Sequence, residues 1–229
     1  MTERIETGIP GLDNLIEGGF VKGSLILLAG TTGTCKTIFA LQYILHGLRN
    51  GENGVYLSLE QTEDEILEDV EKFGWDKELR KYIEEGKFIL YSRVPTEIKE
   101  VTDVALSLIK RVNAKRFVLD SISVLTLAWK VSKDIGKIRM ELMNMIRMIK
   151  NTGVTSILIA EIPETKAKAL SRLGIEEFIV DGIIVLHYLE FASSETPRSL
   201  IIRKMRRTDH GTDIYPFKLT NKGIVVKGV

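Results

Sequence analysis

The sequence predicts an α/β fold with a mostly parallel sheet flanked by helices and with antiparallel strands at its C-terminal end. Apolar runs of strand length alternate with helical patterns along most of the chain, which favours βαβ units. After about Asp181 the segments become strand-like with short connections, which favours antiparallel pairing. No linker, repeat or low-complexity stretch interrupts the 229 residues, so we expect one domain over residues 1–229.

The predicted elements follow one another in a regular order. Residues 24–30 form a continuous apolar run that ends in glycine, as expected of a strand buried on both faces. A helix is predicted from Lys36 and ends at Gly51. The other strands are predicted at residues 54–60, 87–93, 115–120, 154–161, 182–191, 198–207, 213–220 and 223–226, and the other helices at residues 63–73, 98–112 and 134–150.

The composition excludes several classes of protein. A net charge of +1 gives no overall attraction to nucleic acid or to an anionic membrane, although a local basic patch remains open. The single cysteine, Cys35, precludes an intramolecular disulfide and favours a reducing compartment. The N-terminus lacks a signal-peptide pattern, and no apolar stretch approaches the roughly 20 residues that cross a bilayer. We therefore expect a cytoplasmic protein without membrane association.

The segment GTTGTCKT, residues 30–37, lies between a predicted strand and a predicted helix. In that context the backbone N–H groups and the helix N-terminus stabilise phosphate charge, while Lys36 reaches the β/γ oxygens and Thr37 binds Mg²⁺. The usual pattern has glycine where this chain has Cys35, so a glycine-rich turn before an ordinary helix is the alternative. The expected nucleotide-binding residues of this loop are Thr32, Gly33, Thr34, Cys35, Lys36 and Thr37.

Two acidic residues come at the ends of predicted strands. The carboxyl ends of parallel strands meet at one edge of a sheet, so Asp120 and Glu60 are expected to lie near Lys36. Asp120 would orient Mg²⁺ through water, and Glu60 would act as general base on the attacking water. The alternatives are that Asp120 caps the following turn and that Glu60 is a solvated strand end.

Two cations follow near the C-terminus. Lys204 and Arg206 are two residues apart on a predicted strand, hence on one face. They are either part of a solvated edge strand or a pair of positive groups for phosphate, most useful when presented to a neighbouring subunit. His210 belongs to the same edge, whereas His46 and His187 are interpreted as structural.

Several segments together resemble a known family. RIETGIPGLDNLIEGGFVKGSLILLAG, the phosphate loop, VYLSLEQTEDEI, FGWD, RFVLDSISVL, GIEEFIVDGIIVLHYLE and KMRRTDHGTDIYPFKLTNKGI all resemble one domain of the circadian-clock ATPase KaiC. They also resemble the single-domain KaiC-like proteins of archaea, in order and over essentially the whole chain. The resemblance implies a RecA-like P-loop core, ATP and Mg²⁺ bound at subunit interfaces, and a homo-oligomeric ring, usually a hexamer.

The resemblance also implies roles at matching positions. Lys36 and Thr37 match the phosphate-binding lysine and the Mg²⁺-binding threonine of the family. Glu60 matches the first of two adjacent catalytic glutamates, and Asp120 matches the Walker B aspartate. The residues that match groups contacting ATP from the adjoining protomer are Lys204, Arg206, Thr208 and His210.

Three departures from the family pattern bear on activity. Cys35 replaces a loop glycine, and Gln61 stands where the second catalytic glutamate is expected, which argues against fast hydrolysis. Glu177 and Phe178 stand where the kinase-competent domain of KaiC carries its Ser-Thr acceptor pair, which argues against clock-type autophosphorylation.

Three functions follow in order of preference. The first is a ring-forming ATPase with slow Mg²⁺-dependent turnover. The second is a nucleotide-gated scaffold with negligible hydrolysis that binds a protein partner left unidentified by the sequence. The third is a DNA-binding, recombinase-like protein, because basic residues follow two strands where RecA-type rings present central loops. These residues are Lys130, Lys133, Lys166, Lys168 and Arg172.

Overall fold

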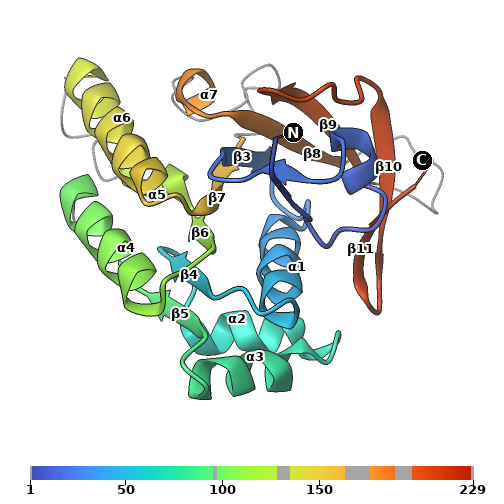
Figure 1. Ribbon diagram of the computed structural model, residues 1–229, viewed down its shortest axis with the longest axis horizontal. Coiled ribbons are helices and arrows are strands. Elements are labelled where there is room, and N and C mark those ends of the chain that lie inside the picture. The colour runs from blue at the N-terminus through green and yellow to red at the C-terminus, as the bar shows by residue number, and fades with distance from the viewer. Residues whose placement is uncertain (1, 95–96, 128–134, 163–175, 189–197, 228–229) are drawn as a thin grey trace.

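A nine-stranded sheet runs through the centre of the molecule (Figure 1), seen here in a computed structural model that describes residues 2–94, 97–127, 135–162, 176–188 and 198–227. In spatial order the strands are β11 (Gly223–Val226), β10 (Ile214–Thr220), β9 (Arg198–Met205), β8 (Gly182–Tyr188), β3 (Leu25–Gly30), β7 (Thr155–Glu161), β6 (Arg116–Asp120), β4 (Gly54–Ser58) and β5 (Phe88–Ser92). The strands from β8 to β5 are parallel, and β9, β10 and β11 continue the sheet in antiparallel pairing. The predicted α/β class is therefore confirmed.

Helices cover both faces of the parallel strands. In the described residues they are α1 (Lys36–Arg49), α2 (Glu63–Glu71), α3 (Trp75–Glu84), α4 (Ile98–Val112), α5 (Ile122–Leu127), α6 (Ile135–Asn151) and α7 (Glu176–Ile179). Figure 1 shows α4 and α6 on one side of the sheet and α1 on the other, with α2 and α3 beyond it. A short antiparallel pair, β1 (Arg4–Ile5) and β2 (Phe20–Val21), flanks the 3-10 helix η1 (Asp13–Ile16) near the N-terminus.

The apolar runs of the strands fill two cores. Successive side chains of a strand point to opposite faces, so Leu25 and Leu27 pack in the core beneath α4 and α6. Ile26 and Leu28 pack in the other core with the helix α1. Both faces of β3 are thus buried, which is why its sequence lacks any polar alternation.

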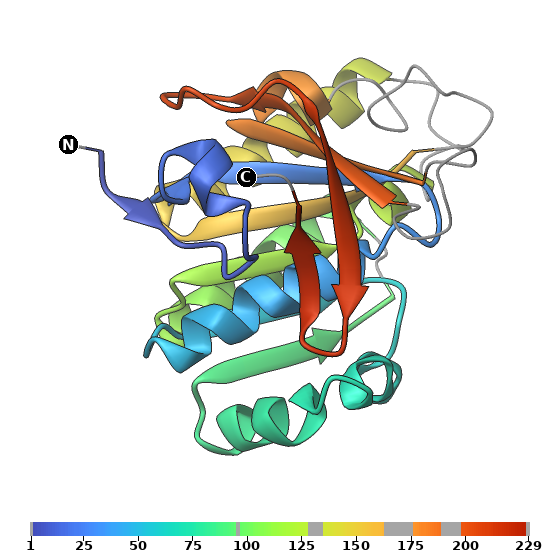
Figure 2. The same ribbon diagram turned by 90° about the vertical axis from the view of Figure 1, so that its right-hand side faces the viewer.

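The C-terminal hairpin of β10 and β11 crosses beside α1 (Figure 2) and is tied to it through one buried amide. The Gln42 side chain accepts a hydrogen bond from Ile224 N at 2.7 Å and donates to the Ile224 carbonyl oxygen at 3.1 Å. Its amide nitrogen also donates to the Gly8 carbonyl oxygen at 2.9 Å. Gln42 therefore joins the helix after the phosphate loop to both ends of the chain.

The structure differs from the sequence prediction in several places, and the short elements β1, η1, β2, α5 and α7 were not predicted. Helix α3 was not predicted, because it buries only Trp75 and Leu79 and most of its other residues are charged; Gly74, at φ +70°, separates it from α2. Strand β4 ends at Ser58, two residues before Glu60, because the Ser58 hydroxyl closes a turn with the backbone of Gln61. The prediction that Glu60 ends this strand was therefore wrong by two residues.

The predicted strand that carries Lys204 and Arg206 also ends early. Strand β9 stops at Met205, and Arg206 lies in the turn that follows, where Arg207 takes a left-handed φ of +59°. The two cations are therefore not on one face of one strand, as their spacing had predicted. No helix in the described part of the chain is long and apolar enough to cross a membrane.

A buried cation holds the start of β6 in place. The Arg116 side chain is almost fully buried, donates to a Glu52 carboxylate oxygen at 2.5 Å and to the Tyr43 carbonyl oxygen at 2.8 Å, and lies over the Tyr43 ring. Because a buried charge without its partner is costly, Glu52→Ala should lower the free energy of unfolding by about 1–3 kcal/mol. Urea denaturation measures this change.

The matched control is Glu68→Ala, which removes an exposed glutamate of α2. It should change the free energy of unfolding by less than about 0.5 kcal/mol. Equal effects of the two substitutions would show that the contact between Glu52 and Arg116 does not stabilise the fold.

Candidate nucleotide site

The loop between β3 and α1 is shaped to receive an anion. The Thr34 hydroxyl donates to the Thr31 carbonyl oxygen at 2.7 Å and closes the loop on itself. Gly33 has φ +76°, and a Cβ added there would meet no heavy atom within 4 Å, so the loop faces open space at this point. Helix α1 begins at Lys36, and the first amides of a helix lack intrahelical acceptors and attract negative charge.

Close packing beneath the loop fixes its course. A Cβ on Gly30 would lie 2.6 Å from the Thr34 hydroxyl oxygen and 2.8 Å from the Leu186 carbonyl oxygen. Glycine is therefore required at the point where β3 passes into the loop. Thr32 is exposed.

Lys36 is a half-buried cation surrounded by acids. Its Nζ donates to the Thr31 carbonyl oxygen at 2.9 Å. Burial lowers the pKa of Lys36, and attraction to the carboxylates of Glu161, Asp120 and Glu60 partly offsets that effect. The ammonium group is thus placed beside the loop, in a poorly solvated position where a phosphate oxygen could replace a backbone acceptor.

Asp120 links the helix that follows the loop to the centre of the sheet. One of its carboxylate oxygens accepts hydrogen bonds from the Thr37 hydroxyl at 3.0 Å and from the Tyr56 hydroxyl at 2.5 Å. Burial raises the pKa of Asp120, whereas these two hydrogen bonds and the charge of Lys36 lower it. Hydroxyl and carboxylate oxygens at this spacing form the kind of donor set that Mg²⁺ prefers.

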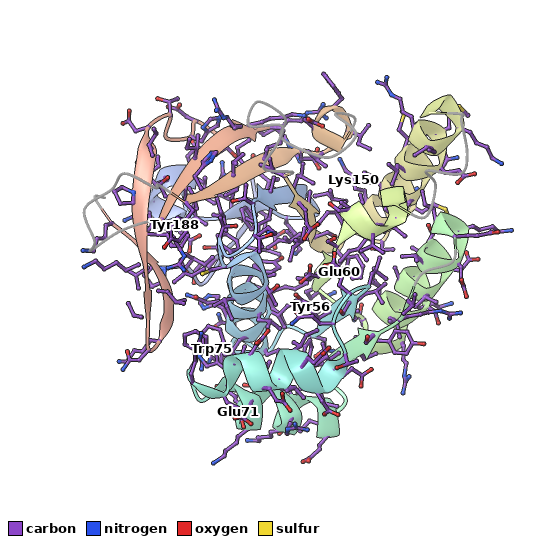
Figure 3. All side chains as sticks on the ribbon, turned by 180° about the vertical axis from the view of Figure 1, so that it is seen from behind. Tyr56, Glu60, Glu71, Trp75, Lys150 and Tyr188 are labelled. Carbon is purple, nitrogen blue, oxygen red and sulfur yellow. The ribbon has the colours of Figure 1, made fainter. Side chains whose placement is uncertain are left out.

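Glu60 lies just beyond β4, on the same side of the sheet. It accepts a short hydrogen bond from the Ser121 hydroxyl, which follows Asp120 in the chain. Burial raises the pKa of Glu60, and the neighbouring carboxylates of Glu161 and Asp120 raise it further. Figure 3 shows Glu60 and Tyr56 together near the middle of the molecule. A carboxylate with a raised pKa is a stronger base than an ordinary glutamate.

The structure thus brings Lys36, Thr37, Glu60 and Asp120 together at the carboxyl edge of the sheet. It does not bring the C-terminal cations there. Lys204 pairs with Ile183, and Ile183 in turn pairs with Leu27, three residues before the end of β3. At roughly 3.3 Å per residue, Lys204 lies about 10 Å back along the sheet, toward its amino edge.

At that edge the two cations contact other groups. Lys204 Nζ donates to the carbonyl oxygens of Glu177 at 3.1 Å and Val180 at 2.7 Å. The Arg206 guanidinium lies 3.7 Å from the Asp181 carboxylate, and its side chain is 53% exposed. Arg206 therefore faces solvent in one subunit rather than the subunit's own phosphate loop.

Thr208 and His210 also form their hydrogen bonds with groups outside the phosphate loop. Thr208 accepts from Arg4 Nη1 at 3.0 Å, and His210 Nδ1 pairs with the Gly211 carbonyl oxygen at 2.9 Å. Of the histidines interpreted as structural, His46 pairs with Glu6, and burial lowers the pKa of His187. The basic residues expected to line central loops all lie outside the described residues, namely Lys130, Lys133, Lys166, Lys168 and Arg172.

Sequence reasoning missed three residues of the site. Glu161 ends β7 opposite Gly30, and its position after an apolar run was the same signal that identified Asp120. Tyr56 lies inside a fully buried strand, where nothing in the pattern marks its hydroxyl as functional. Arg198 begins β9, and its Nε donates to the Gly33 carbonyl oxygen at 3.3 Å. Only the antiparallel pairing of β9 with β8 brings it to the loop.

The Cys35 thiol precedes α1, where a helix N-terminus and Lys36 would favour a thiolate. Burial raises the pKa of the Cys35 thiol, and the charges of Arg198, Lys72 and Lys36 only partly oppose that effect. The side chain packs against the core that contains α1. Desolvation therefore outweighs the helix N-terminus and the nearby cations, and the thiol stays protonated at neutral pH.

Comparison with known proteins gives one family. The model of the KaiC ATPase family matches residues 5–228. A UPF0273 protein of Pyrococcus furiosus is 35% identical, over 99% of this chain and 94% of the relative. The circadian clock protein KaiC3 of Synechocystis is 32% identical over 98% of this chain, which spans 45% of that relative. The crystal structure of a KaiC-like protein from Pyrococcus horikoshii matches with a TM-score of 0.88 and 40% identity, and the match covers 100% of both chains.

Cys35 itself provides a test of how the loop is held. It has φ +69°, a left-handed conformation that costs a residue with a Cβ about 1 kcal/mol or more. Cys35→Gly removes both this strain and the sulfur, whereas Cys35→Ala removes the sulfur alone. In urea denaturation, the glycine variant should be more stable than the alanine variant by about 1 kcal/mol. An alanine variant of equal or greater stability would contradict the left-handed geometry.

Proposed function

The chain belongs to the KaiC family of P-loop ATPases, and from this premise we propose that it is a ring-forming, Mg²⁺-dependent ATPase with slow turnover at subunit interfaces. The observation that carries the proposal is the hydrogen bond between Thr37 and Asp120 beside the phosphate loop. It supports the proposal because Thr37, the expected Mg²⁺ ligand, and Asp120, expected to orient the ion through water, lie within hydrogen-bond distance of each other.

The donor set fits Mg²⁺ bound together with a triphosphate. Thr37 and Asp120 offer one hydroxyl and one carboxylate, and the described residues contain no cluster of three or more acidic, histidine or cysteine side chains that could hold a metal alone. Mg²⁺ typically keeps several waters and is held by one or two protein oxygens plus substrate phosphates. Once bound, it would neutralise charge on the phosphate oxygens.

The charges of the site support a requirement for that ion. Lys36 lies beside the loop and faces the carboxylates of Glu60, Asp120 and Glu161. A bound triphosphate would add further negative charge to this group of carboxylates. The helix N-terminus and Lys36 attract it, but the acids oppose it, so nucleotide should bind weakly without a divalent cation.

In the proposed hydrolysis, Glu60 takes a proton from water while the water oxygen bonds to the γ-phosphorus. The bond between that phosphorus and the bridging oxygen breaks, and ADP leaves with the electron pair. The raised pKa of Glu60 suits it to accept the proton, and the Ser121 hydroxyl orients its carboxylate. Lys36 would stabilise the charge that develops on the phosphoryl oxygens.

The cations at the amino edge would complete the site of a neighbouring subunit. Arg206 is half-exposed and lies too far from its own phosphate loop to act in cis. In a ring in which subunits meet head to tail, it would instead reach the nucleotide of the neighbouring subunit. The same ring would place Lys204 at that interface. A hexamer is the assembly that we propose by analogy with KaiC proteins.

Slow turnover is proposed because one expected acid is missing. Gln61 replaces it, and its side chain amide donates to Asp69 on α2 at 3.0 Å, away from the hydroxyl that orients Glu60. The same feature favours a second candidate, a nucleotide-gated scaffold with negligible hydrolysis. Autophosphorylation of the KaiC type is not proposed, because Glu177 and Phe178 have no hydroxyl to accept a phosphoryl group.

Lys36→Ala tests the location of the site. The substitution should leave the fold intact and abolish the thermal stabilisation by Mg-ATP. At about 100 times the dissociation constant, the wild-type protein should gain about 5–10 °C in Tm, because ligand binds only the native state. Differential scanning fluorimetry with Mg-ATP, and with ATP plus EDTA, measures both the shift and its dependence on Mg²⁺.

The control is Lys77→Ala, which removes an exposed lysine of α3 and should keep the full shift. If Lys36→Ala were stabilised by Mg-ATP as much as the wild type, the nucleotide site would have to lie elsewhere.

Subunit mixing tests the ring. Arg206→Ala alone and Glu60→Gln alone should each reduce phosphate release to near background, since arginine fingers elsewhere contribute about 10³–10⁵ in rate. Mixed in equal amounts and allowed to exchange, the two should recover about one quarter of wild-type turnover per protomer, because random assembly pairs an intact Glu60 with an intact Arg206 at that frequency. Phosphate release and light scattering measure turnover and assembly.

Absence of recovery at every mixing ratio would rule out action of Arg206 in trans. A wild-type protein that assembles with Mg-ATP but releases no phosphate would instead favour the nucleotide-gated scaffold.

A further inference from the structure

Asp181 is a buried carboxylate to which three elements of the fold converge. It is 5% exposed and precedes β8. Its Oδ2 accepts from the backbone N–H of Leu25 at 3.0 Å, at the start of β3. Its Oδ1 accepts from Lys150 Nζ at 2.8 Å, near the C-terminal end of α6 (Figure 3), and lies 3.7 Å from the Arg206 guanidinium.

These contacts make Asp181 a rigid anchor. A buried carboxylate is costly unless it is paired and hydrogen-bonded, and the backbone N–H and the ammonium group supply both. The Arg206 backbone N–H also donates to the Asp181 carbonyl oxygen at 2.9 Å. Both the backbone and the side chain of Arg206 therefore contact Asp181.

The contact with the guanidinium leaves it available to a ligand. A separation of 3.7 Å gives charge attraction without a hydrogen bond, so the N–H groups of Arg206 are not used up by Asp181. Arg206 and Lys150 line a surface cavity of about 350 Å³ together with Arg147 and Phe178. Positive charge thus gathers at this surface above a single buried acid, which suits it to face an anion.

We propose that Asp181 is a positioning residue that holds the Arg206 side chain in the orientation from which it reaches the nucleotide of the adjoining subunit. An exposed arginine without such an anchor would lose side-chain entropy on each encounter and would sample unproductive orientations. The inference rests on the proposed function, because it requires that Arg206 acts in trans.

A purely local role makes a different prediction. Through Leu25, Asp181 also supports β3, the strand that leads into the phosphate loop of its own subunit. If that support were its contribution, its loss would damage the nucleotide site in cis. If the orientation of Arg206 were its contribution, its loss would damage the site of the neighbour.

Asp181→Asn separates the two roles, since asparagine keeps the size and an oxygen for Leu25 but removes the charge. Alone, the variant should bind Mg-ATP as the wild type does and should release phosphate about 10- to 100-fold more slowly. Mixed with Glu60→Gln subunits, it should recover turnover to the same fraction as the mixture of Arg206→Ala with Glu60→Gln. Mixed with Arg206→Ala subunits, it should recover none, because both lack the same half of the interface.

A second variant serves as a control for misfolding of Asp181→Asn. Asp181→Asn leaves the Lys150 ammonium without its carboxylate, so Asp181→Asn combined with Lys150→Met removes both charges. The double variant should unfold at a higher urea concentration than Asp181→Asn and should keep its slow turnover. It replaces the single variant in the mixtures if the single variant does not fold.

Two results would overturn the inference alone. One is failure of the Asp181 variant to recover with Glu60→Gln while Arg206→Ala does recover, and the other is wild-type turnover by the double variant. Failure of Arg206→Ala to recover with Glu60→Gln would overturn the trans action of Arg206, and the inference with it.

Discussion

The hydrogen bond from the Thr37 hydroxyl to the Asp120 carboxylate joins the helix after the phosphate loop to a strand on the far side of β7. Asp120 can serve this contact because β6 is buried on both faces and ends at the same edge as β3. Tyr56, from the next strand, donates to the same carboxylate oxygen and fixes its direction. The two strands β6 and β4 and the helix α1 thus meet at a single buried acid, and the positions of Lys36 and Glu60 follow from the strand ends around it.

The two edges of the sheet carry opposite chemistry. The carboxyl edge gathers Glu60, Asp120 and Glu161 around one lysine, whereas the amino edge presents Arg206 and Lys150 over buried Asp181. Antiparallel pairing of β9 with β8 produces this separation, because it returns the chain to the amino edge before the cations appear. In the proposed assembly, the acidic edge of one copy would face the cations at the amino edge of the next copy in a head-to-tail contact.

The phosphate loop combines an unusual residue with an ordinary backbone. Cys35 adopts the left-handed conformation that glycine takes without strain, and its partly buried side chain packs against the core. The loop therefore keeps its path at the cost of local strain. Arg198 reaches the Gly33 carbonyl oxygen from the first residue of β9, so the antiparallel extension also supports the loop directly.

The α/β class, the strand–loop–helix context of Lys36 and the grouping of Asp120 with Thr37 were predictable from the sequence, because buried parallel strands leave long apolar runs and their carboxyl ends share one edge. The hydroxyl of Tyr56, the approach of Arg198 and the anchoring of Arg206 by Asp181 were not, since each depends on which strands become neighbours and in which register. The pKa of Cys35 also depended on the fold. A helix N-terminus and the adjacent Lys36 are visible in the sequence, but the burial that outweighs them arises only when the loop packs against the core.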